Sequence, residues 1–202
     1  MKFLIFSDLH AFEKESLNKI KLPEDCKTVM FLGDIKASTL RYIMDYFPKL
    51  NYYGILGNHD DLNLFDSVNQ INQILEKPKI IDADLKKIET EMTFIGLKGC
   101  VKYNNNIGYT QEEAVTLPLD SADILFSHET GYHYINSEKD DITHEGYIAI
   151  DKYLENNKPK YNIFGHHHKN CIFQKYKTVC VGVFGCVLFD TLTEKRIIFF
   201  EK

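Results

Sequence analysis

The sequence predicts an α/β fold in which two β-sheets pack face to face, with helices on the outside. Three observations indicate this class. Five short apolar runs end abruptly in polar residues, as buried parallel strands do. The first half of the chain alternates between such runs and helical segments, and the tail from 170 to 200 reads as closely spaced strands. Because crossovers between parallel strands are right-handed, the strands of the first half are expected to lie parallel.

The first half supplies the strand–helix units. The expected elements are a strand at 2–6, a short helix at 13–20, a strand at 28–32, a helix at 37–47 and a strand at 52–56. Pro48 ends the second helix, because proline has no amide hydrogen and clashes with the preceding turn.

The second half is richer in β-structure. The expected elements are β-like runs at 79–81, 85–88 and 92–95, a helix at 110–117, a strand at 123–126, a helix at 146–156, a strand at 161–164, and tail strands at 171–176, 179–183, 186–190 and 196–200. Two polar segments, 97–109 and 129–145, are expected to be loops that shape a pocket, since loops often carry function.

Size and composition limit the class of protein. The 202 residues, 44% of them hydrophobic, fit a single domain over 1–202. A net charge of −5 argues against a broad basic surface for nucleic acid. No apolar stretch reaches the ~20 residues of a membrane span, and the first residues lack a signal-peptide layout. Five cysteines without Cys-x-x-Cys spacing predict reduced, mostly buried thiols and a cytoplasmic location.

Metal-ligand side chains follow the five apolar runs. They are Asp8 and His10, Asp34, Asn58 with His59 and Asp60, His128, and His166 with His168. Functional groups in open α/β sheets gather at the carboxyl ends of the strands, so these side chains are expected in one crevice. Mixed imidazole and carboxylate ligands suit Mn, Fe, Zn or Ni better than Ca or Mg. No cysteine belongs to the set, which disfavours a structural zinc site.

Taken in order, these motifs resemble the calcineurin-like metallophosphoesterase family, in particular its small, uncapped bacterial-type members. The resemblance implies a four-layer αββα sandwich of two mixed β-sheets flanked by helices, and two divalent metal ions with manganese favoured over iron, zinc or nickel. The first ion would be held by Asp8, His10, Asp34 and His168. The second ion would be held by Asp34, Asn58, His128 and His166.

The resemblance also implies a reaction. A hydroxide bridging the two ions would attack the phosphorus, and His59 would face the substrate phosphate and protonate the leaving group. General acids of this kind contribute about 10²–10⁴-fold to the rate. The expected substrate is a small or nucleotide-like phosphodiester.

Several departures from the family pattern bear on activity. Ala37 stands where many members carry an aspartate that orients the catalytic histidine, and Asp60 or Asp61 is the candidate replacement. No arginine follows Asp34 closely and the third motif ends in Asp60, which disfavours a protein phosphatase. Without a bidentate arginine clamp for a dianion, a diester is preferred over a monoester.

Two other functions stay open. Ser7-Asp8-Leu9-His10 also resembles the start of recombination-type exonucleases, although those proteins are longer and carry a DNA-capping domain. Some family relatives are scaffolds for protein partners, but they typically lose the catalytic histidine or several ligands. The remaining histidines, His133, His144 and His167, are expected at the surface or in the core rather than as ligands. The sequence does not predict an oligomeric state.

Overall fold

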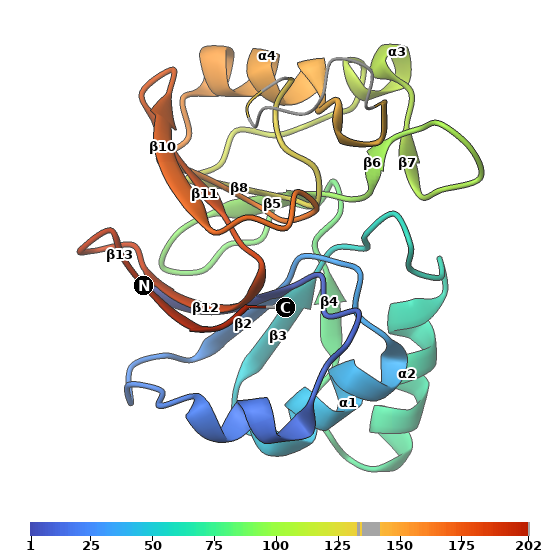
Figure 1. Ribbon diagram of the computed structural model, residues 1–202, viewed down its shortest axis with the longest axis vertical. Coiled ribbons are helices and arrows are strands. Elements are labelled where there is room, and N and C mark those ends of the chain that lie inside the picture. Colours follow the sequence, from blue (N-terminus) through green and yellow to red (C-terminus); the bar gives the residue numbers. More distant parts are fainter. Residues whose placement is uncertain (133, 135–141, 202) are drawn as a thin grey trace.

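Two β-sheets lie face to face with helices outside them in the computed structural model, which describes residues 1–132, 134 and 142–201 (Figure 1). One sheet has the strand order β13 (Lys195–Phe200), β12 (Gly185–Asp190), β1 (Lys2–Ser7), β2 (Thr28–Phe31), β3 (Asn51–Gly54), β4 (Ile80–Asp82). The other has the order β10 (Cys171–Lys175), β11 (Thr178–Gly182), β9 (Tyr161–Phe164), β8 (Ile124–Ser127), β5 (Phe94–Leu97).

Both sheets are mixed. Strands β1 to β4 run parallel to one another, while β12 runs antiparallel to β1 and to β13. In the second sheet β5, β8, β9 and β11 are parallel and β10 is antiparallel. The carboxyl ends of the parallel strands therefore meet along one edge in each sheet.

Alternating side chains along the strands build three apolar layers. On β1, Leu4 and Phe6 face the helices, whereas Phe3 and Ile5 face the other sheet. Between the sheets the ring of Phe3 contacts that of Phe126, with centroids 5.3 Å apart. This central layer confirms the expected face-to-face packing.

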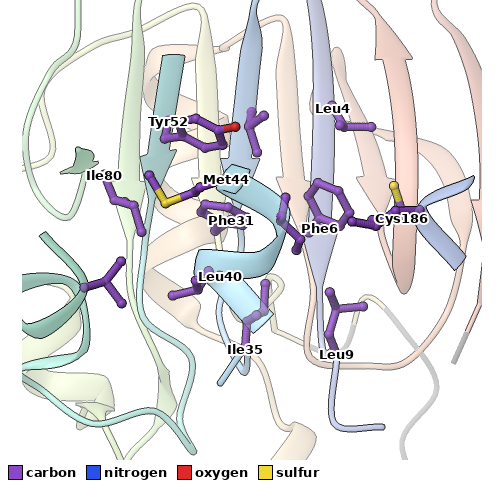
Figure 2. Packing of buried hydrophobic residues seen from close by; sticks show 14 of the residues in the cluster. Leu4, Phe6, Leu9, Phe31, Ile35, Leu40, Met44, Tyr52, Ile80 and Cys186 are labelled. Carbon is purple, nitrogen blue, oxygen red and sulfur yellow. The ribbon is translucent and has the colours of Figure 1, made fainter. Parts of the chain in front are cut away.

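Helices cover both outer faces. Helix α1 (Ala37–Tyr46) and helix α2 (Leu64–Ile74) lie on the six-stranded sheet, with a 3₁₀ helix at Lys14–Lys19 beside them. Figure 2 shows Leu40 and Met44 of α1 over Phe31 of β2. Helix α4 (Ile148–Asn157) covers the other sheet together with the short helix α3 (Gln111–Ala114). The four layers are those of an αββα sandwich, as predicted.

Four details differ from the expectations. The segment expected as a helix at 13–20 forms a 3₁₀ helix. Helix α2 was not anticipated, because polar residues interrupt its apolar positions: Asp and Ser separate Leu64 and Phe65 from Val68, and Asn and Gln follow. The run at 85–88 is no strand, since the chain turns at Leu85 with a φ of 53°. The helix expected at 110–117 is reduced to α3.

Loop 97–109 has structure of its own. It contains two short parallel strands, β6 (Cys100–Val101) and β7 (Gly108–Tyr109), and Asn106 Oδ1 accepts hydrogen bonds from the amides of Tyr103 and Asn104. All five cysteines are free thiols, and four of them are buried, as expected. Within the described residues, no helix is long and apolar enough to cross a membrane.

Candidate metal centre

Polar side chains that follow strands of both sheets gather where the carboxyl ends of those strands meet. Asp8 follows β1, Asp34 follows β2 and Asn58 follows β3, while His128 and His166 follow β8 and β9 of the other sheet. The ligand atoms of Asp8, Asp34 and His128 all lie within 4.8 Å of one another, as do those of Asp8, His10 and His168. The structure thus assembles two overlapping groups of metal-binding side chains that share Asp8.

The first group is built on Asp8. Its Oδ2 accepts hydrogen bonds from Ser7 Oγ at 2.6 Å and from the amide of His166 at 2.9 Å. Its Oδ1 is buried, has no hydrogen-bond partner within the described part of the chain, and lies 3.5 Å from His168 Nε2. Burial opposes ionisation, but His168, His128 and Ser7 outweigh it and lower the pKa of Asp8 to about 2. A buried, ionised and unpartnered carboxylate oxygen beside an imidazole suits a cation.

His10 completes this group. Its ring centroid lies 5.3 Å from that of His168, and its Nε2 lies 4.0 Å from Asp34 Oδ2. Both imidazole rings are about half exposed, so this side of the site opens to solvent. The ion pair with Asp8 raises the pKa of His168 above its ordinary value, against the opposing effect of burial.

The second group centres on His128, which is fully buried. Its Nδ1 lies 2.6 Å from the carbonyl of Leu32, which can only accept, so Nδ1 carries the hydrogen. Its Nε2 lies 2.8 Å from Asn58 Oδ1, a second acceptor. Two facing lone pairs repel each other, and a cation beside them would relieve the repulsion. Burial opposes the charged form of the ring, but Asp34 and Asp8 raise the pKa of His128 above its ordinary value.

The ring of His166 lies beside that of His128, with centroids 5.0 Å apart. Its Nε2 donates to the carbonyl of Thr143 at 2.7 Å, which leaves Nδ1 as the free ligand atom. Burial lowers the pKa of His166 to about 4, so the ring is neutral near pH 7. A neutral imidazole is the form that binds metal ions.

Four candidate ligands have strained backbone conformations. Asp8, Asp34, His166 and His168 all have left-handed backbone conformations, with φ of 57°, 56°, 63° and 50°. Side chains other than glycine adopt this region rarely, at a cost of about 1–3 kcal/mol each. Such strain persists where the surrounding structure holds a functional geometry in place.

Two glycines allow the loops after β2 and β3 to touch. Gly33 has a φ of 93°, and a Cβ there would lie 2.2 Å from the amide nitrogen of Gly57. A Cβ on Gly57 would lie 2.1 Å from Asp34 Oδ1. Only glycine fits at either position, which explains why glycine precedes both Asp34 and Asn58.

His59 lies at the mouth of the site. Its side chain is exposed, its amide donates to Asp34 Oδ1 at 2.9 Å, and its ring centroid lies 6.1 Å from that of His10. A groove of about 560 Å³ begins here. Its lining comprises His10, Asp34, Ile35, Lys36, Ala37, His59, Asp60, Asp61 and Leu64.

Asp60 binds backbone amides. Its two carboxylate oxygens accept hydrogen bonds from the amides of Asp34, Ile35 and Gly57, at 2.9, 3.1 and 2.7 Å. Burial raises the pKa of this carboxyl above its ordinary value. Asp60 therefore holds the loops of two metal ligands together.

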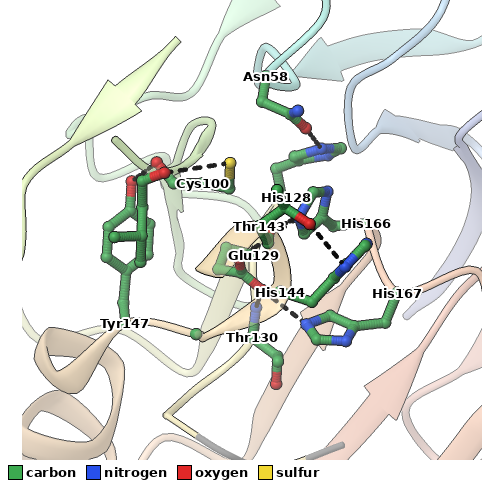
Figure 3. Close-up of polar contacts among 12 residues, drawn as sticks. Asn58, Cys100, His128, Glu129, Thr130, Thr143, His144, Tyr147, His166 and His167 are labelled. Atoms are coloured by element: carbon green, nitrogen blue, oxygen red, sulfur yellow. Dashed lines mark hydrogen bonds and ion pairs between the residues drawn. The ribbon is translucent and has the colours of Figure 1, made fainter. Parts of the chain in front are cut away.

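Several residues near the site were not anticipated as part of it. Figure 3 shows the buried Glu129 hydrogen-bonded to His167, whose side chain is only 5% exposed, with the ring of His144 near that of His166. From loop 97–109, Tyr103 Oη accepts a hydrogen bond from Asn58 Nδ2 at 3.4 Å. His133 and residues 135–141 of loop 129–145 lie outside the described residues.

Solved structures share this fold at low sequence identity. A Thermus thermophilus protein, TT1561, is 14% identical, with a TM-score of 0.61, over 97% of this chain and 96% of that one. A novel archaeal phosphodiesterase is 17% identical, with a TM-score of 0.52, over 98% of each chain. Phosphopantetheinyl hydrolase from Mycobacterium tuberculosis is 11% identical, with a TM-score of 0.59, over 90% of this chain and 89% of that one.

A search of curated proteins finds no match. The family model of the calcineurin-like phosphoesterase superfamily domain, in contrast, matches residues 1–189. That range contains both groups of metal-binding side chains and every strand end that carries them. With its αββα layers and its ordered ligand motifs, this chain belongs to the calcineurin-like phosphoesterase superfamily.

Proposed function

We propose that this chain is a dinuclear-metal phosphodiesterase that hydrolyses small or nucleotide-like phosphate diesters. The position of Asp34 is the observation that carries the proposal. Its Oδ2 lies 4.0 Å from His10 Nε2 and 3.7 Å from His128 Nε2, so one carboxylate oxygen faces both ligand groups. A shared carboxylate is the arrangement that a pair of close metal ions requires.

The donor set suits two divalent ions. Asp8, His10, Asp34 and His168 would hold one, and Asp34, Asn58, His128 and His166 would hold the other. Imidazole mixed with carboxylate and amide oxygen favours manganese, with iron, zinc or nickel as alternatives. When bound, such ions activate water and polarise phosphoryl oxygens as Lewis acids.

His59 would donate a proton to the leaving group. It is exposed at the groove, and the hydrogen bond from its amide to Asp34 fixes its backbone beside the shared carboxylate. From there its imidazolium can hold a proton for the departing ester oxygen. Ile35, Ala37 and Leu64 supply an apolar wall for the organic part of the substrate.

The groove supports a small diester substrate. Its volume of about 560 Å³ is in the range of small-molecule sites. Lys36 is its sole permanently cationic side chain among the described residues, and no arginine lines it. A monoester dianion calls for a bidentate arginine clamp, whereas a diester monoanion does not. The likeness to an archaeal phosphodiesterase and to a phosphopantetheinyl hydrolase supports the same substrate class.

The test compares bis(p-nitrophenyl) phosphate with p-nitrophenyl phosphate as substrates. The protein is assayed with added Mn²⁺ and again with a chelator, with His59→Ala as the matched variant. We expect chelator-sensitive hydrolysis that favours the diester and falls sharply in the variant. Absence of turnover of both esters with two ions bound would refute the proposal and turn attention to a scaffold function.

A further inference from the structure

Glu129 is a fully buried carboxylate one residue beyond the ligand His128. Its Oε1 accepts hydrogen bonds from His167 Nε2 at 2.7 Å and from the amide of Thr130 at 2.9 Å. The carboxyl group of Glu129 is thus fixed inside the protein, away from solvent.

The second oxygen of Glu129 has no hydrogen-bond partner among the described residues. Oε2 is buried and lies 3.5 Å from His166 Nε2. A buried carboxylate oxygen without a partner is costly, and structures retain one where it has a task. The two bonds to Oε1 determine where Oε2 lies, so its position beside His166 is built into the fold (Figure 3).

A second contact of His166 indicates what Glu129 Oε2 does at this position. The same Nε2 donates to the carbonyl of Thr143 at 2.7 Å, so two oxygens flank the N–H edge of the ring. Ligand histidines commonly donate their second ring nitrogen to a carboxylate or carbonyl, which fixes the tautomer and the ring orientation. Here that edge faces Thr143 and Glu129, and Nδ1 is left for a metal ion.

We propose that Glu129 is a positioning residue, which holds His166 so that its Nδ1 is presented to the second metal ion. His167 is the anchor of Glu129 in this arrangement, because it binds the oxygen that His166 does not face. The inference rests on the proposed dinuclear centre but concerns one ion of the pair. Residues that hydrogen-bond to metal ligands in this way change the metal affinity by about 10–100-fold when they are removed.

The test measures Mn²⁺ binding to the metal-free protein by titration calorimetry, with Glu129→Gln as the variant. We expect the second Mn²⁺ to bind about 10–100-fold more weakly than in the wild type, with the first nearly unchanged. Electron paramagnetic resonance supplies a separate readout. At two equivalents of Mn²⁺ the wild type should show an exchange-coupled pair, and the variant a mononuclear six-line signal.

Two further variants separate positioning from a general loss of structure. His167→Gln releases the anchor and keeps the carboxylate, so it should weaken the second ion by a smaller factor. Glu155→Gln, on the exposed side of α4, removes a charge without touching the site and should leave both affinities unchanged. Thermal melts of the metal-free proteins establish that each variant is folded.

The outcomes are distinguishable. Two tightly bound ions in folded Glu129→Gln, with an exchange-coupled signal, would overturn this inference and leave the proposed function standing. A wild type that never binds two ions would refute the proposed centre itself. Cys100, Glu129 and His166 also have ligand atoms within 4.8 Å of one another. A third Mn²⁺ bound by the wild type and lost in Glu129→Gln would make Glu129 a ligand and overturn the positioning role.

Discussion

Asp60 Oδ2 accepts the backbone amide of Asp34 at 2.9 Å, and the same oxygen accepts the amide of Gly57 at 2.7 Å. One partly buried carboxylate thereby joins the loop after β2 to the loop after β3. The loop after β2 carries Asp34 and the loop after β3 carries Asn58, so these two candidate ligands are held in a fixed relative position. The amide of His59 adds a further hydrogen bond between the two loops, to Asp34 Oδ1 at 2.9 Å.

Asp60→Ala should therefore damage stability and metal binding together. Three backbone amides would lose their acceptor, and each buried unsatisfied donor costs about 1–3 kcal/mol. After relaxation we expect a loss of about 3 kcal/mol in the free energy of unfolding, measured by urea titration of the metal-free protein. Asp61→Ala is the control. Asp61 is exposed, and among the described residues its carboxylate accepts a hydrogen bond from the amide of Asn63. Equal losses in both variants would contradict the joining role of Asp60.

His59→Ala should remove catalysis and leave the metal ions in place. The ring is exposed at the groove and only its backbone contacts Asp34, so the ligand groups stay intact without it. We expect kcat on diesters to fall by about 10²–10⁴-fold, with unchanged Mn²⁺ stoichiometry. A series of aryl phosphodiesters checks the role, because the deficit should grow as the leaving group becomes poorer. A uniform deficit across the series would show that His59 acts before bond cleavage.

Asp34→Asn should weaken the binding of both metal ions. One oxygen of this carboxylate faces both ligand groups, so neutralising it weakens both sites at once. Ligands that bind only the native state raise its stability, by about 2.7 kcal/mol at a concentration of 100 times Kd. We expect Mn²⁺ to raise the melting temperature of the wild type and to leave that of Asp34→Asn nearly unchanged. An equal rise in both proteins would place the bound ions elsewhere.

The carboxyl of Asp123 should contribute pH-dependent stability remote from the site. It accepts hydrogen bonds from the amide and hydroxyl of Thr93, both at 3.0 Å, and pairs with Lys160 at 3.2 Å. Burial would raise its pKa, but these partners lower it below the ordinary value. A carboxyl with a lower pKa in the folded state stabilises the fold above its unfolded pKa of about 4, and that contribution is lost as the pH falls through the folded value.

Asp123→Asn should accordingly be less stable than the wild type by about 1 kcal/mol at pH 7. The difference should shrink as the pH falls below about 4 and vanish once the pH is below the folded-state pKa, where the wild-type carboxyl is protonated as well. Urea unfolding of metal-free protein at several pH values checks this. A difference that persists undiminished in acid would assign the loss to packing.

The gathering of the candidate ligands at one place was predictable because each lies just beyond a buried apolar run. Strand ends of both sheets meet there, which brings Asp34 and His128 together. Glu129 carried no such signal, because its partner His167 lies 38 residues away and becomes a neighbour only through the fold. Helix α2 was hidden by the polar residues among its apolar positions. The cytoplasmic location and the identity of the metal stay predictions.

Stepwise reconstitution of the metal-free protein with Mn²⁺ tests the central claim most directly. Hydrolysis of bis(p-nitrophenyl) phosphate is followed as metal is added, and bound Mn²⁺ is counted in the same samples. The account predicts little activity with one ion per chain, a steep rise with the second, and complete loss on chelation. A protein that holds two Mn²⁺ ions and still leaves the diester intact would contradict it.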